Sequence, residues 1–228
     1  KLYPTMGHPG PWDPDRLTMT MDELKAVAET VHERGKKCRG HIVTKKGILA
    51  GIEAGLDLID HGDSMDGECI SAITETGTFV CPSGHFIVTL LDEAKRRGES
   101  DSPYWRRVQD EFDRFCSILP EANSAGMKLV VGDDYGTAKM PHGMYAKELE
   151  TYVKTMGIAP VDVIRWATKN GAELMGMADK LGTIEKGKLA DLLVIDGDPT
   201  MDIKVLQDLN KLKAIMKGGR FVKDTLNA

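Results

Sequence analysis

The sequence lacks several features that mark particular classes of protein. Its apolar runs are much shorter than the roughly 20 residues of a membrane-spanning helix, so we expect no membrane partner. Lysine and arginine form no stripe and do not alternate with aromatic residues, and the formal net charge is −5, so we expect no nucleic-acid partner. The four cysteines form no C-x-x-C pair, which favours free thiols in a reducing compartment.

The start of the chain also lacks familiar signals. It reads KLYPT, with neither an initiator methionine nor the pattern of a signal peptide. Because this start already belongs to an apolar segment, we expect the sequence to be the C-terminal part of a longer polypeptide. A cytoplasmic location is therefore only a default expectation.

What the sequence does contain is an alternation of short apolar segments with longer amphipathic ones. Strands are expected at 1–3, 36–43, 56–60, 78–82 and 127–134. Helices are expected at 22–34, 46–54, 66–76, 103–125 with a break near Pro120, 145–156, 160–168 and 170–177. Such alternation is typical of βαβ units and predicts an α/β fold with a parallel sheet.

Two further segments stand apart from this alternation. The charged stretch 83–102 is expected to be a surface loop, with an active-site lid as the alternative. From about residue 179 the sequence becomes rich in turns and short strands. We therefore expect one domain at 1–178 and a second at 179–228.

Groups able to bind metal follow several of the predicted strands. Lys1 opens the first segment, and His41, His61 and His85 lie at or just after the next three. Asp134 ends the fifth. In a parallel α/β barrel the chemistry is carried at that end of the strands, and imidazole with carboxylate suits a zinc-like ion.

Each of these residues also has a structural interpretation. His41 alone is better explained as a polar strand end, Asp134 fits a helix or loop cap equally well, and His61 fits either reading. Three candidate ligands at the ends of three strands favour a metal site over chance placement. The carboxylates near His61, in GLDLIDHGD, are expected to cap loops and face solvent, and His32 is expected to be a surface or helix-end cation.

Several longer segments together carry a more specific signal. They are HERGKKCRGH (32–41), GIEAGLDLIDHG (51–62), GTFVCPS (77–83), VVGDDYG (130–136), PHGMYAKELE (141–150), LGTIEKGKLADLLVIDGDPTMDI (181–203) and IMKGGRFVK (215–223). With these segments the chain resembles the amidohydrolase superfamily, in the branch of metal-dependent hydrolases related to imidazolonepropionase and to prolidase-like Xaa-Pro and Xaa-Arg dipeptidases. The resemblance implies a (β/α)8 TIM barrel, with strands 4 to 8 in this chain, followed by the closing strands of a small β-sandwich.

The resemblance also implies the metal site. His41, His61 and Asp134 match family ligands, and Lys1 stands where binuclear members have a carboxylated lysine that bridges two metal ions. Two zinc ions per complete barrel are expected, with manganese, iron or cobalt as alternatives. Two positions depart from the family: Asp133 replaces the usual threonine of a G-T-D triplet, and His8 replaces a glycine.

The implied reaction is hydrolysis of a C–N bond in an amide, peptide or cyclic amide. A metal-bound hydroxide would attack the carbonyl, and Asp134 would act as general base and then general acid. His142, Tyr135 and His85 are the candidates for substrate contacts. The alternatives are an ester hydrolase that uses the same metals and a non-catalytic fragment that needs a partner.

One motif of the family is absent from the sequence. The first barrel strand of these proteins ends in H-x-H, which supplies two further ligands, and no H-x-H occurs in the 228 residues. A barrel without its first strands would expose two long edges. We therefore expect a missing N-terminal segment with this motif to complete the barrel, and we expect a homo-oligomer.

Overall fold

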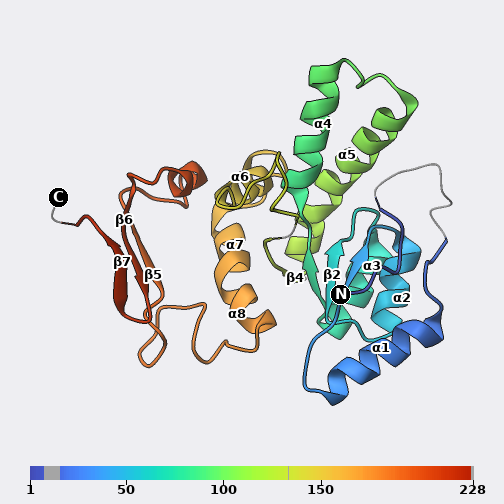
Figure 1. Ribbon diagram of the computed structural model, residues 1–228, viewed down its shortest axis with the longest axis horizontal. Helices are drawn as coiled ribbons and strands as arrows, with labels where there is room; N and C mark the ends of the chain where they lie inside the picture. Colours follow the sequence, from blue (N-terminus) through green and yellow to red (C-terminus); the bar gives the residue numbers. More distant parts are fainter. Residues whose placement is uncertain (8–15, 133, 227–228) are drawn as a thin grey trace. The chain divides into compact units, whose positions relative to one another are not determined.

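The computed structural model describes residues 1–7, 16–132 and 134–226 (Figure 1). Contacts divide the chain into two compact units, Lys1–Met140 and Pro141–Ala228. The domain boundary expected at residue 179 falls inside the second unit, where its helices give way to its strands. His8 and Asp133 lie outside the described residues.

The first unit is an α/β structure around a parallel sheet. Its strands are β1 (Arg39–Ile42), β2 (Leu58–His61), β3 (Phe79–Cys81) and β4 (Lys128–Leu129). Its helices are α1 (Met21–Glu33), α2 (Lys45–Glu53), α3 (Gly67–Thr76), α4 (Gly84–Arg97) and α5 (Pro103–Ser124). The strands pair in the order β1-β2-β3-β4, all parallel, which confirms the α/β alternation. Their C-terminal ends consequently meet at one edge of the sheet.

The first expected strand, 1–3, is reduced to a single parallel bridge between Leu2 and Gly40. Leu2 exchanges backbone hydrogen bonds with the segment around Gly40, donating to Arg39 and accepting from His41 at 2.8 Å each. The Thr5 hydroxyl then accepts a hydrogen bond from the backbone N–H of Val43 at 3.1 Å. The start of the chain therefore runs beside β1, held by only a few contacts.

The expectation of a loop at 83–102 is wrong, because most of it forms α4, which pairs with α5 in a helical hairpin (Figure 1). The charges in the second half of the segment made its helical spacing of apolar residues hard to recognise. In the structure Ile87 and Ala94 are buried. Glu93 and Arg97 pair one turn apart, and Gly98 ends the helix in the left-handed conformation.

The expected break near Pro120 is also wrong, because α5 continues through it to Ser124. Proline removes one helical hydrogen bond and strains the preceding turn. Leu119 and Ala122, on either side of Pro120, are fully buried. Their packing holds this part of the helix in place, so tertiary contacts outweigh the local preference.

The strands owe their placement to a buried apolar layer. Ile42, Ile59, Val80 and Leu129, one from each strand or its flank, are 3% exposed or less. Because this layer fixes the four strands, it also fixes the residues that follow them.

A carboxylate at the start of α3 offers a stability test. Asp66 accepts hydrogen bonds from the backbone N–H groups of Glu68 and Cys69, and its ion pair with Lys45 lowers the pKa of Asp66. We expect Asp66→Ala to lower the free energy of unfolding by about 1 kcal/mol at neutral pH, because the cap is lost. Asp66→Asn keeps an N-cap and should cost less.

The pH dependence of this effect follows from the direction of the shift. The folded pKa of Asp66 lies below the ordinary 3.8, so its ionic contribution is present above that value and is lost as the pH falls through the folded pKa. Urea unfolding across this range should show wild type and Asp66→Asn converging in acid. A difference that is constant with pH would contradict the ion-pair contribution.

The second unit contains helices followed by an antiparallel sheet. The helical part comprises α6 (Ala146–Lys154), α7 (Pro160–Arg165), a π-helical turn (Trp166–Asn170) and α8 (Gly171–Leu174). The rest comprises β5 (Leu192–Ile195), a 3-10 helix (Ile203–Gln207), β6 (Leu212–Lys217) and β7 (Arg220–Asp224). The buried rings of Tyr152 and Trp166, 5.3 Å apart, form the centre of the helical part.

The three strands of this unit pair in the order β5-β6-β7. Several apolar side chains on them are solvent-exposed: Leu193, Val194, Phe221 and Val222.

Two other expectations concern the chain as a whole. All four cysteines are free thiols, as their spacing predicted. In the described part of the chain, every helix is too short or too polar to cross a bilayer.

Candidate functional site

The centre of the candidate site is a pair of histidines at the C-terminal edge of the parallel sheet. In the register of β1 and β2, His41 lies beside Asp60 and Ile42 lies beside His61. The two imidazole rings are 4.6 Å apart and meet edge to face at 72°. His61 is almost fully buried, whereas His41 is half-buried.

An unusual backbone conformation brings these rings together. Successive residues of a strand point to opposite faces, which would place His61 across the sheet from Asp60 and His41. His61 instead has a φ of 75°, in the left-handed region. This interrupts the alternation at the last residue of β2, and the His61 ring lies against that of His41. Gly62, also left-handed, then donates its N–H to Ile42 and keeps the chain beside β1.

Asp134 joins this pair from the segment that follows β4. Its Oδ2 lies 4.0 Å from Nε2 of His61, and its side chain is 29% exposed. Its φ of 56° is left-handed, which is uncommon outside glycine but better tolerated by aspartate than by most residues. The structure thus places His61 between two other candidate ligands, with the ring of His41 on one hand and the carboxylate of Asp134 on the other.

Left-handed conformations recur along this edge. Among the described residues, the only non-glycine residues with positive φ are His61, Ser83 and Asp134, and they follow or end β2, β3 and β4 respectively. Each such conformation costs about 1–3 kcal/mol and persists where the surroundings enforce it, often at functional sites. Ser83 is buried, and its hydroxyl faces the carbonyl groups of Cys81 and Gly132 at 3.4 and 3.5 Å. No sequence pattern pointed to Ser83.

Asp60 is the functional candidate that the sequence pattern missed. The expectation that the carboxylates near His61 cap loops and face solvent is wrong for Asp60, which is fully buried in β2, and for Asp63, which is 6% exposed. The Oδ2 of Asp60 lies 3.0 Å from Nζ of Lys1 and 2.7 Å from Nε and from Nη2 of Arg39. Asp60 directly precedes His61 in the sequence, and the register of β1 and β2 places it beside His41.

Lys1 enters the site through this carboxylate. Its ammonium lies 5.7 Å from the centre of the Tyr3 ring, which in turn lies 5.5 Å from the ring of His41. Lys1 is therefore close to the histidine pair, and its described ion pair is with Asp60.

The candidates for substrate contacts are placed as follows. Tyr135 is half-buried directly after Asp134, and His85 is half-buried as the second residue of α4. His142 belongs to the second unit, where its Nδ1 lies 2.8 Å from the hydroxyl of Tyr145.

Comparison of the chain with known proteins identifies its family. The family model described as "Amidohydrolase family" matches residues 9–222. The chain belongs to the amidohydrolase family. This confirms the resemblance inferred from the sequence segments.

Two amidohydrolase relatives lie among curated proteins. Ochratoxinase of Aspergillus niger is 28% identical over 212 residues, which cover 92% of this chain and 43% of that protein. Imidazolonepropionase of Flavobacterium johnsoniae is 25% identical over 181 residues, covering 77% of this chain and 38% of that protein.

Solved structures give the same picture. The crystal structure of A. niger ochratoxinase matches with a TM-score of 0.83 at 26% identity, covering 93% of this chain and 47% of that one. The structure of a Xaa-Pro dipeptidase with bound methionine in its active site matches with a TM-score of 0.78 at 28% identity, covering 91% of this chain and 50% of that one. The amidohydrolase chain described here thus spans about half the length of the relatives it matches.

The donor set at the sheet edge fits a divalent metal. Two imidazoles and a carboxylate are the ligand types that zinc and similar ions prefer. Ligand atoms about 2.0–2.2 Å from one ion lie roughly 3–3.5 Å apart. The 4.0 Å between His61 Nε2 and Asp134 Oδ2 needs only a small shift to reach that spacing.

Proposed function

We propose that the protein containing this chain is a metal-dependent hydrolase that cleaves a C–N bond in a small amide, peptide or cyclic amide. One observation carries the proposal: His61 lies beside both His41 and Asp134 at one edge of a parallel sheet in a chain of the amidohydrolase family. The names of the relatives, ochratoxinase, imidazolonepropionase and Xaa-Pro dipeptidase, support a small substrate of this kind.

In this proposal the residues of the chain divide the work. His41, His61 and Asp134 would hold the metal, with Lys1 and Asp60 beside them. A bound divalent ion supplies a Lewis acid that polarises a carbonyl group and activates water near neutral pH. Asp134 accepts the proton from the attacking water and returns it to the leaving amine. The partial exposure of Asp134 leaves its carboxylate within reach of a substrate.

Carboxylation of Lys1 is a finer part of the proposal. A carbamate on Nζ would be an anion, and Asp60 Oδ2 lies only 3.0 Å away. Two anions at that distance repel each other unless cations lie between them or beside them. Arg39, which contacts the same oxygen, and two metal ions would supply that compensation. We therefore propose that carboxylation of Lys1 accompanies metal binding.

We further propose that β1 to β4 are strands 5 to 8 of a (β/α)8 barrel, with the segment at 1–3 as strand 4. The sheet β5-β6-β7 would be the closing part of a β-sandwich. The chain spans about half the length of these relatives, which supports a further segment that would complete the barrel and the sandwich. That this segment carries H-x-H is part of the proposal. The exposed apolar side chains of β5 and β7 are consistent with a second layer over that sheet.

The test is elemental analysis of the protein purified from its source, combined with hydrolysis assays on dipeptides, N-acyl amino acids and cyclic amides. We expect about two divalent ions per copy of this chain, and cleavage of at least one substrate class. About one ion per copy would favour a mononuclear site with an unmodified Lys1. Absence of both metal and a co-purifying partner would contradict the proposal in favour of a non-catalytic fragment.

A pair of histidine variants tests the ligand assignment. We expect His61→Asn to lose at least one metal ion per copy and its activity, because it removes a ligand while asparagine tolerates the left-handed backbone. The matched control is His142→Asn, which removes a histidine that is not a proposed ligand and should retain the metal. Full metal retention in His61→Asn would contradict the assignment of His61.

A further inference from the structure

A second cluster of potential ligands lies at the opposite end of the same strands. His32 is in the last turn of α1, Cys38 immediately precedes β1, and Asp57 immediately precedes β2. One ligand atom from each, the His nitrogen, the Cys Sγ and a carboxylate oxygen, lie within 4.8 Å of one another. The catalytic proposal uses none of these residues.

We propose that His32, Cys38 and Asp57 form a second divalent-metal site, selective for a thiophilic ion such as zinc. The set combines a thiol, an imidazole and a carboxylate, which together favour zinc or cobalt over magnesium or calcium. The site is independent of the proposed hydrolase function, because it lies at the other end of β1 and β2.

The internal geometry is close to that of a bound site. Nε2 of His32 lies 2.9 Å from Oδ2 of Asp57, and the same oxygen accepts the backbone N–H of Cys38 at 2.8 Å. Ligand atoms of a tetrahedral zinc site lie about 3.3–3.8 Å apart. An ion could thus lie among the three ligand atoms after shifts of roughly 1 Å or less, with His32 binding through the lone pair of its neutral imidazole. The His32 side chain, 44% exposed, is free to rotate by that amount.

An ion pair without metal explains only part of this arrangement. Exposed pairs such as His32–Asp57 typically contribute about 0–1 kcal/mol to stability. The pair alone therefore does not explain why a cysteine lies beside it. Cys38 is 4% exposed, and its backbone is already anchored by Asp57. A metal ion uses all three groups at once and ties the end of α1 to two strands.

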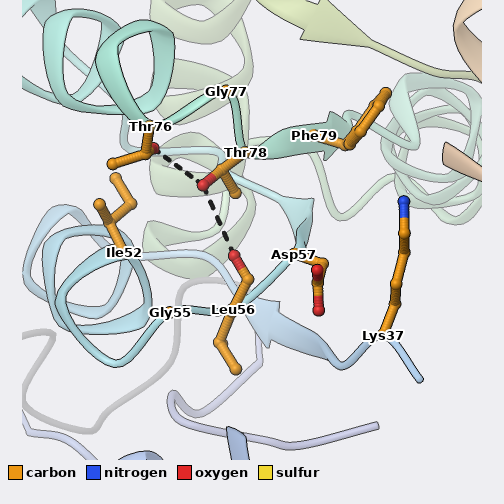
Figure 2. A pocket seen from close by; sticks show the side chains of 9 residues that line it. All are labelled: Lys37, Ile52, Gly55, Leu56, Asp57, Thr76, Gly77, Thr78 and Phe79. Atoms are coloured by element: carbon orange, nitrogen blue, oxygen red, sulfur yellow. Dashed lines mark hydrogen bonds between the residues drawn. The ribbon is translucent and has the colours of Figure 1, made fainter. Parts of the chain in front are cut away.

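A cavity borders one of the three groups, Asp57. Asp57 lines a cavity of about 230 Å³ together with Lys37, Phe79 and Thr78 among others, which is large enough for water (Figure 2). Figure 2 shows the Lys37 side chain extending towards Phe79, and its ammonium lies 5.4 Å from the centre of that ring. Asp57 and a Cys38 thiolate would together balance the charge of a divalent ion.

Metal binding at this site must release a proton. An ordinary cysteine thiol, with a pKa of about 8.5, is mostly protonated at pH 7. The ligand is the thiolate, and metal affinity should therefore rise with pH.

The test is titration of the full chain with cobalt(II), a zinc substitute that gives a near-ultraviolet charge-transfer absorption when a thiolate binds it. We expect this absorption in wild type, and we expect Cys38→Ser to abolish it. Cys69→Ser and Cys116→Ser are the matched controls and should leave it unchanged. A His41→Ala, His61→Asn double variant should also keep it, which separates this site from the proposed catalytic one.

A second variant is needed because a substitution at the buried Cys38 could itself disturb folding. His32→Gln changes an exposed side chain, and we expect it to weaken cobalt binding by about tenfold or more, since even outer partners of metal ligands are worth 10–100-fold. Three results would overturn the proposal: no thiolate absorption in wild type with cobalt in excess, absorption that survives Cys38→Ser, or unchanged affinity in His32→Gln.

Discussion

Replacing Asp134 with asparagine is expected to lower kcat by about 10²–10⁴-fold, the usual contribution of a general acid–base group. Asparagine keeps the size of the side chain and accepts the left-handed φ of 56° at this position. Alanine would add roughly 1–2 kcal/mol of backbone strain to the chemical loss and confuse the two. Steady-state kinetics on the metal-loaded protein provide the measurement.

Two controls make the Asp134 result interpretable. Thermal unfolding should be nearly unchanged in Asp134→Asn, because the side chain is 29% exposed and the backbone conformation is kept. Metal content separates loss of a proton acceptor from loss of a ligand. Near-normal turnover in this variant would remove Asp134 from the catalytic role and weaken the proposed reaction as a whole.

Asp60→Asn is expected to produce the largest loss of stability, about 3 kcal/mol in the free energy of unfolding. The substitution keeps the shape of a fully buried side chain but removes the negative charge that holds Lys1 and Arg39 together. Breaking a buried ion pair typically costs about 3–5 kcal/mol, and the lower end applies because both partners reach solvent. Their side chains are 29% and 38% exposed.

The matched control for Asp60 is an ion pair on the surface. Glu53→Gln breaks the pair with Lys25, in which both side chains are well exposed, and should cost less than about 1 kcal/mol. Urea unfolding of the two variants under the same conditions gives the comparison. Equal losses would mean that Asp60 is not an essential buried charge of the site.

The sequence predicted the sheet and part of the site for a clear physical reason. Parallel strands joined by helices place their C-terminal ends together, so His41, His61 and Asp134 could be expected to meet once the strands were recognised. The helices α1 to α3 followed from apolar spacing and terminal glycines. These features depend on local patterns, which single sequences record well.

What the sequence could not predict depends on contacts between distant segments. The burial of Asp60 requires Lys1 and Arg39 to be brought to it, and the backbone of Ser83 is set by its neighbours. His32, interpreted as a surface cation, meets Cys38 and Asp57 because the last turn of α1 lies beside the residues that precede β1 and β2. Likewise, Pro120 remains helical because Leu119 and Ala122 are buried.

The exposed apolar side chains of the β5-β6-β7 sheet have a consequence for the behaviour of the protein in solution. Among the described residues, β5 pairs only with β6, and its sequence LLVI carries no charge that would discourage another strand from adding to its edge. Salts such as sulfate strengthen apolar association. The chain on its own should therefore show attractive colloidal interactions, with light scattering that rises with protein concentration and with sulfate. Charged substitutions at Leu193 or Phe221 should raise its solubility limit without touching the proposed site.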